Sequence, residues 1–178
     1  MSIPDTGPLV ADLSSEQTHN MPLSPYVAAI RARIGHDLLL LPSVGAAVFD
    51  ERGRLLLGRH ADDGLWGTLG GAVEPGEDPK VAVVREVAEE VGIAVAIDGV
   101  IGTYGGPEFQ ITYPNGERVA FVSTFYACRV LPEDAPMAAL DDEISGSGWF
   151  TRAQALALNR RPWSDRTIPD AFDWWAAR

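Results

Sequence analysis

The segment from Gly71 to Ile93 constrains the fold more than any other part of this 178-residue chain. A turn containing glycine leads into Asp78, whose carboxylate can cap a helix. Pro79 then takes the first helical position, where the N–H that proline lacks would have no partner within the helix. Gly92 is a typical residue for ending a helix. The sequence therefore predicts one helix that begins at Pro79 and ends before Gly92.

Within this helix the apolar residues recur at steps of three and four, which predicts one stripe that packs on a core: Val81, Val84, Val87, Ala88 and Val91. Glu86, Glu89 and Glu90 share that spacing and centre roughly opposite the stripe. Three neighbouring carboxylates repel one another unless a cation lies on them, and oxygen ligands suit Mg²⁺ or Mn²⁺, which also bind phosphate oxygens. The alternative is a solvated acidic helix face.

The same segment resembles the Nudix box, G-x5-E-x7-R-E-U-x-E-E-x-G-U with U apolar, and it has every fixed position: Gly71, Glu77, Arg85, Glu86, Val87, Glu89, Glu90, Gly92 and Ile93. A match of this length is far more specific than a lone glycine motif. The resemblance to Nudix hydrolases implies an α/β fold, an α/β/α sandwich with a mixed sheet between helices. Leu69 stands where the family usually has a proline, a departure that concerns the rigidity of the turn and not the metal site.

The resemblance also implies a metal site on the box helix, with Mg²⁺ or Mn²⁺ as cofactor. Its ligands would be three carboxylates and one backbone carbonyl: Glu86, Glu89, Glu90 and either Gly70 or Gly71. Arg85 and Glu77 match positions with a structural or orienting role, because a guanidinium can hold a carboxylate in place. The cation would bridge diphosphate oxygens and help to deprotonate a water.

The catalytic base is left open by the sequence. Glu86 or Glu89 could take the proton, although several relatives place the base on a loop outside the box. The loop candidates here are Glu143 first, then Asp142 or Glu108, and a solvated loop charge is the alternative reading of Glu143.

Substrate selectivity is expected to come from residues outside the box. Arg59, at a strand end, could meet a phosphate, and Trp66, Phe109 and Tyr113 could stack on a base. The alternatives are a surface cation and core aromatics. Pro107 follows the box at a distance where ADP-ribose-type members often carry a proline, and a turn explains it equally well.

Length and composition limit the remaining choices. With 46% apolar and 22% charged residues, the chain reads as one globular domain over residues 25–178, preceded by an arm or tail at residues 1–24. A net charge of −11 argues against nucleic acid or an anionic membrane as partner and allows a nucleotide-like small molecule held through a metal. A single cysteine, Cys128, excludes an internal disulfide. The sequence shows no membrane span or signal peptide, so we expect a cytoplasmic protein.

Turn residues and hydrophobic periodicity predict the other helices and strands. Ser24 and Pro25 begin a helix that ends near Gly35, and this helix could cover a sheet edge or pair two subunits as a homodimer. Thr151 caps a helix through residue 158, and a last helix is expected over residues 169–175. The strand-like runs, of which 119–130 is the longest and should be central, are 38–41, 44–49, 54–59, 95–97, 100–104, 109–113, 119–130 and 149–150.

Three functions follow from the resemblance. The first is Mg²⁺-dependent hydrolysis of the diphosphate linkage in a nucleoside diphosphate joined to another group, of the ADP-ribose or nucleotide-sugar type. The second is MutT-like pyrophosphohydrolysis of oxidised dNTPs. The third, of another class, is a nucleotide sensor that no longer cleaves. Such domains usually lose box carboxylates, and this chain has lost none. Isoprenoid diphosphate isomerisation would need a catalytic cysteine, and Cys128 lies in an apolar run.

Overall fold

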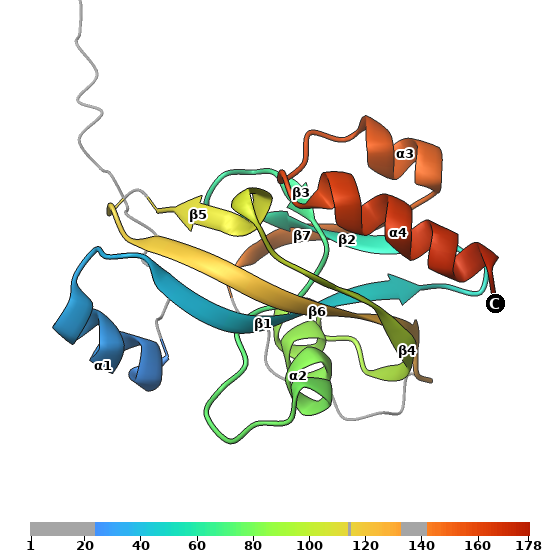
Figure 1. Cartoon of the computed structure of the whole chain (residues 1–178). Coiled ribbons are helices and arrows are strands. Elements are labelled where there is room, and N and C mark those ends of the chain that lie inside the picture. The colour runs from blue at the N-terminus through green and yellow to red at the C-terminus, as the bar shows by residue number, and fades with distance from the viewer. Residues whose placement is uncertain (1–23, 114, 133–141) are drawn as a thin grey trace, which may run out of the picture.

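The computed structural model describes residues 24–113, 115–132 and 142–178 (Figure 1). The arm expected over residues 1–24 therefore lies outside the described residues, except for Ser24. One curled sheet lies between helices, with α2 (Pro79–Val91) on one side and α3 (Arg152–Ala157) and α4 (Ser164–Ala176) on the other (Figure 1). This arrangement confirms the predicted α/β/α sandwich.

The sheet is mixed, as expected. The strands in chain order are β1 (Leu39–Phe49), β2 (Leu55–His60), β3 (Trp66–Gly67), β4 (Val95–Tyr104), β5 (Gln110–Thr112), β6 (Arg118–Val130) and β7 (Ile144–Phe150). Their order across the sheet is β3-β2-β1-β6-β4, with β5 also on β6 and β7 also on β2. β1 and β6 are parallel and the other pairs are antiparallel. The longest strand, β6, lies between β1 and β4, so its predicted central place is confirmed.

Two pairs of predicted strands are each one continuous strand. β1 runs through Pro42, which was expected to end it. Among the described strands β6 alone pairs with this half of β1, and the segment along its other edge makes isolated bridges such as Ser43 with Ala72, so the missing N–H of Pro42 interrupts no regular ladder. The Pro42 carbonyl still accepts a hydrogen bond from the Val73 N–H, at 3.1 Å. β4 likewise continues from Val95 to Tyr104, because bulges near Ile97 and Gly102 absorb its irregular register.

The last helix starts earlier than predicted. α4 begins at Ser164 and contains Pro169 inside it. Ile168, Ala171 and Phe172 are buried against the sheet, and this burial offsets the backbone hydrogen bond that an interior proline removes. The capped helix at Thr151 is confirmed, since Thr151 and Gln154 form a reciprocal capping box.

Two hydrophobic clusters hold the helices to the sheet. One lies under α2 and includes Val83 and Val87, and the other lies under α3 and α4 and includes Phe49. A third cluster joins α1 (Pro25–Ile34) to the start of β1 through Val27. The helix predicted at Ser24 is thus confirmed and covers part of β1 within its own chain, while the homodimer stays a prediction. No helix in the described part of the chain is long and apolar enough to cross a membrane.

Candidate active site

The box helix is set by the local signals that the sequence carries. The Asp78 Oδ1 accepts from the Lys80 N–H at 2.8 Å, and Gly92 ends the helix with φ of 68°. Its predicted apolar stripe is partly wrong. Val81 is 59% exposed, whereas Val83 and Val87 are fully buried. The buried face is therefore rotated from the one that the spacing of valines indicated.

This rotation changes the position of the carboxylates. Glu90 is only 4% exposed and lies on the buried side of α2, and the Glu86 side chain is 13% exposed. Only Glu89, at 39%, remains open to solvent. The expectation that all three carboxylates lie opposite the core is therefore wrong, and so is the alternative of a solvated acidic face. A buried carboxylate needs a donor or a cation beside it.

The glycine turn before α2 supplies close contacts to two of these carboxylates. The Gly70 N–H donates to the Glu90 Oε2 at 2.9 Å. A Cβ at Gly71 would lie 2.5 Å from a Glu86 carboxylate oxygen, so the absence of a side chain at Gly71 lets Glu86 approach the turn. Gly70 has φ of 138°, and a Cβ there would lie 2.2 Å from the Val44 carbonyl oxygen. Glycine is required at both positions for different reasons.

Arg85 links the acidic groups into one network. Its Nε and Nη2 donate to the two carboxylate oxygens of Glu77 at 2.8 and 2.9 Å. Its Nη1 donates to Glu86 at 2.8 Å and to Glu89 at 2.9 Å. The hydrogen bonds from Arg85 lower the pKa of Glu77. These contacts agree with the orienting role that the sequence suggested for Arg85 and Glu77.

The carboxyl group of Glu86 is strongly perturbed. Its pKa is raised to about 7, chiefly by burial; Arg85 lowers the pKa, and the charges of Glu89 and Glu143 add to the increase. The charge of Glu143 therefore acts on the box carboxylates. The Ala61 N–H donates to the Glu143 backbone carbonyl at 2.9 Å and fixes this residue at the start of β7.

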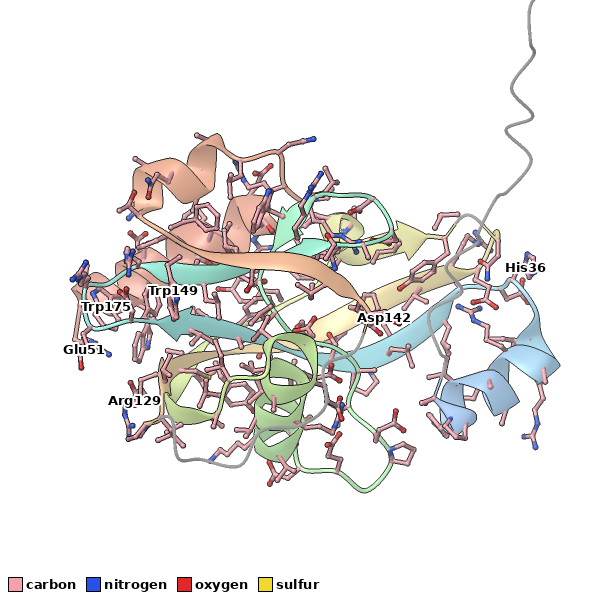
Figure 2. The ribbon with its side chains drawn as sticks, turned by 180° about the vertical axis from the view of Figure 1, so that it is seen from behind. His36, Glu51, Arg129, Asp142, Trp149 and Trp175 are labelled. Carbon is pink, nitrogen blue, oxygen red and sulfur yellow. The ribbon has the colours of Figure 1, made fainter. Side chains whose placement is uncertain are left out.

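The other two carboxylates considered as bases have different surroundings. Asp142 is exposed and lies two residues before β7 (Figure 2). Glu108 pairs with Arg166 of α4 at 2.7 Å. Of the three loop carboxylates, Glu143 is the one whose charge acts on Glu86.

The donor set at this site suits a hard divalent cation. In the described part of the chain, no three His, Cys, Asp or Glu side chains converge closely enough to hold a metal ion as they stand. The Nη1 of Arg85 instead occupies the position between Glu86 and Glu89. A cation that replaced this contact would find carboxylate oxygens only, and Arg85 would keep both bonds to Glu77. The residues therefore fit Mg²⁺ or Mn²⁺.

Three of the residues suggested for substrate binding have structural contacts. The Arg59 Nε donates to the Gly64 carbonyl at 3.0 Å and remains exposed. Trp66 packs edge-to-face on Phe150, with ring centroids 5.0 Å apart. Phe109 is 4% exposed and packs between Tyr104, Phe125 and Trp163.

Tyr113 lies nearer to the acidic site. Burial raises the pKa of Tyr113, and the charges of Arg161, Asp62 and Glu143 also act on its phenol. Tyr113 packs against the cluster under α1, and its phenol feels the charges of Glu143 and of a group of residues that the sequence did not single out. That group contains Arg161, Asp62 and Asp63, joined by ion pairs. No short motif marks them, although one signal was available: two arginines and a tryptophan stand together in Arg160-Arg161-Pro162-Trp163.

Comparison with known proteins identifies the class that this fold and site define. A family model described as the NUDIX domain matches residues 39–171. The chain belongs to the Nudix family.

Two relatives are similar over shorter segments. A "MutT-like protein" of Streptomyces ambofaciens is 48% identical over 62 residues, 35% of this chain and 40% of the relative. A "Putative 8-oxo-dGTP diphosphatase" of Bacillus subtilis is 43% identical over 63 residues, 35% of this chain and 42% of the relative. The chain thus matches about two-fifths of the length of these relatives.

A solved structure is similar over more of the chain. An ADP-ribose pyrophosphatase from Streptococcus suis superposes with a TM-score of 0.57 at 25% identity and covers 78% of this chain and 92% of its own. These names indicate related hydrolases with different substrates.

Proposed function

We propose that this chain hydrolyses the diphosphate linkage of a nucleoside diphosphate joined to another group, of the ADP-ribose or nucleotide-sugar type. The observation that carries the proposal is the acidic site itself. Buried Glu86 and Glu90 meet the Gly70–Gly71 turn, Glu89 lies beside them, and the charge of Glu143 reaches Glu86. Buried carboxylates in such a group are costly without a cation.

Glu86, Glu89 and Glu90 would hold Mg²⁺ or Mn²⁺, together with one backbone oxygen. The Gly71 carbonyl already accepts from the Val44 N–H at 2.9 Å, so the Gly70 carbonyl is the stronger candidate. When bound, the cation neutralises charge on the diphosphate and makes a water more acidic. Glu77 would keep its two bonds to Arg85 and hold the guanidinium when the cation replaces the contacts of Arg85 with Glu86 and Glu89.

Glu143 is the base that we favour. It lies outside the proposed ligand set, and a carboxylate can accept the proton of the attacking water. The Ala61 N–H fixes its backbone, and its charge acts on Glu86. Glu86 and Glu89 remain alternatives, because each has a second carboxylate oxygen.

The pyrophosphohydrolysis of oxidised dNTPs is the second candidate. The names of the Streptomyces and Bacillus relatives favour it, whereas the Streptococcus structure favours the first candidate. A sensor that binds without cleaving is the candidate of another class, and the complete set of box carboxylates argues against it.

A substrate panel with Mg²⁺ separates these functions. The panel contains ADP-ribose, UDP-glucose, a dinucleoside polyphosphate, dGTP and 8-oxo-dGTP, and products are resolved by chromatography. Cleavage of the linked diphosphates with release of a nucleoside monophosphate supports the first proposal. Release of pyrophosphate from 8-oxo-dGTP alone would replace it with the second. Binding of one compound without any product would indicate a sensor.

A further inference from the structure

A cavity lies beside the loop that leads into the box helix. It has a volume of about 280 Å³ and is enclosed by α1, the first half of β1 and the loop before α2 (Figure 1). Its lining includes Val27, Leu40, Pro42 and Val73. Among the described residues that line it, only Glu74 carries a charge. Because a charged or polar group loses its hydration on burial, such a lining favours an apolar occupant.

Two large side chains of this lining are left open by the described residues. Leu40 of β1 is 65% exposed and Tyr26 of α1 is 49% exposed. Val27 and Leu41, which also line the cavity, belong to the buried cluster under α1. The cavity therefore continues a hydrophobic cluster outward to the surface. Exposed apolar surface gathered around a hollow is typical of a site that binds another segment.

The loop before α2 connects this cavity to the network around Arg85. The Ala72 carbonyl accepts from the Arg85 Nη2 at 3.2 Å. The Glu74 N–H donates to the Glu77 Oε2 at 3.0 Å, and the Glu74 carbonyl accepts from the Glu77 N–H at 3.0 Å. Ala72 and Glu74 both line the cavity. An occupant would thus contact the loop that holds Glu77 and Arg85.

The segment directly before Ser24 is within reach of this cavity by connectivity. Ser24 lines the cavity and caps α1, where its Oγ accepts from the Val27 N–H at 3.3 Å. Consecutive Cα atoms lie about 3.8 Å apart, so the Cα of Leu23 is confined to that distance from Ser24 and the Cα of Met21 to about 11 Å. Both side chains therefore start close to the lining.

Met21, Pro22 and Leu23 also match the lining in chemistry. None of the three carries a charge. Pro22 has no N–H that would lose a hydrogen bond on burial, and the unbranched Met21 can fill an irregular hollow. Because this segment is tethered at Ser24, docking costs little translational freedom, which favours it over an untethered second copy of the chain.

We propose that Met21, Pro22 and Leu23 dock in this cavity and brace the loop before α2 against α1. The contact covers Leu40 and Tyr26 and joins the arm to the segment that positions Glu77. It is independent of the activity proposed above, so neither measurement described below uses turnover.

The first measurement attaches an environment-sensitive dye to the full chain carrying Met21→Cys. Cys128 is buried and its pKa is raised to about 12, so the introduced thiol is labelled selectively. Docking predicts that the dye emission is shifted to the blue relative to the urea-unfolded chain, and that dilution leaves this shift unchanged. Leu40→Ser and Tyr26→Ser should each reduce the shift. The matched control is Val100→Ser, since Val100 is 52% exposed on β4 and outside the cavity.

Three outcomes of the dye measurement would overturn the proposal. One is native emission equal to that of the unfolded chain, and another is a blue shift that survives in both Leu40→Ser and Tyr26→Ser. The third is a shift that disappears on dilution, which would assign the cavity to a second copy of the chain. Thermal unfolding of each variant separates loss of docking from loss of fold.

The second measurement is hydrogen exchange of residues 72–77 in the unlabelled full chain. Leu23→Ser should make these amides exchange severalfold faster than in the wild type, because the loop loses its support. Leu23→Met is the matched control, since it keeps an apolar side chain and should keep the wild-type rate. Equal exchange in the wild type and in Leu23→Ser would overturn the bracing of the loop.

Discussion

Arg85 and Glu77 are joined by two parallel hydrogen bonds, at 2.8 and 2.9 Å, and this pair controls how the guanidinium meets the acidic site. Paired bonds of this type fix a guanidinium in direction as well as in place. Because Arg85 also bonds to Glu86 and Glu89, the bonds to Glu77 set where the guanidinium lies beside those two carboxylates. We therefore propose Glu77 as a positioning residue for the proposed metal site.

Replacing Glu77 by Gln should weaken this restraint. We expect the affinity for Mg²⁺ and the value of kcat to fall about 10- to 100-fold, which is typical when a group that orients a metal ligand is lost. Titration of Mg²⁺ against the rate of product formation measures both. Glu74→Gln is the matched control, because Glu74 lies in the same loop and its hydrogen bonds with Glu77 are made by its backbone N–H and carbonyl. A Glu77→Gln variant with the Mg²⁺ dependence of the wild type would contradict the role of Glu77.

Gly70 and Gly71 should respond differently to alanine. Gly70→Ala meets a backbone carbonyl at 2.2 Å and has a positive φ, so we expect a loss of folding stability of about 1–3 kcal/mol. Gly71→Ala meets the Glu86 carboxylate, which can move, so activity should fall while stability changes less. Urea denaturation and turnover, measured on both variants, check the pair. The opposite pattern would mean that the turn does not position Glu86.

His60 predicts a pH dependence of stability that is independent of the acidic site. The pKa of His60 is lowered to about 4, chiefly by burial. The charge of Arg161 also lowers this pKa, whereas the charges of Asp62 and Asp63 raise it. The unfolded chain binds a proton on this imidazole below about pH 6.5, and the folded chain does not until about pH 4. His60 therefore reduces stability progressively as the pH falls through this window, by about 1–2 kcal/mol at pH 5.5 to 5.

The measurement is urea denaturation of the wild type and His60→Gln at pH 7.5 and pH 5.5 in EDTA. The wild type should lose stability relative to the variant as the pH falls. Parallel changes in both proteins would show that His60 titrates normally. The test uses the difference in unfolding free energy between the two proteins. Glu86 has a raised pKa and therefore adds stability as the pH falls, but it does so equally in the wild type and in His60→Gln.

The sequence predicted the box helix and its neighbours because their signals are local. Asp78, Pro79 and Gly92 act on the backbone beside them, and the carboxylates lie within one turn of one another. The side of the helix that is buried was predicted less well. Val81 is exposed and Glu90 is buried, the reverse of the expectation, because the face of α2 that packs on the sheet is the one with Ala82, Val83 and Val87.

The ion-paired group of Arg161, Asp62 and Asp63 could not be predicted from local pattern. Its members come from the loop after β2 and from the connection between α3 and α4, and the bridge between Trp66 and Arg160 joins these distant segments. The same holds for Pro42, which is tolerated because the segment along that edge of β1 forms isolated bridges and no regular ladder. Nothing in a window of neighbouring residues records that contact.

The most direct test of the central claim compares the wild type with Glu90→Gln, using ADP-ribose as substrate in Mg²⁺ and in EDTA. The Gln side chain can still accept from the Gly70 N–H, so the variant should fold with a similar Tm. The matched control is Glu51→Gln. Glu51 lies in the turn between β1 and β2, far from Asp142 at the start of β7 (Figure 2). We predict that turnover by the wild type requires Mg²⁺ and that Glu90→Gln loses it by at least about 100-fold, while Glu51→Gln keeps it. A folded Glu90→Gln variant that turns over ADP-ribose at the wild-type rate would contradict the proposal that the acidic site is the catalytic metal site.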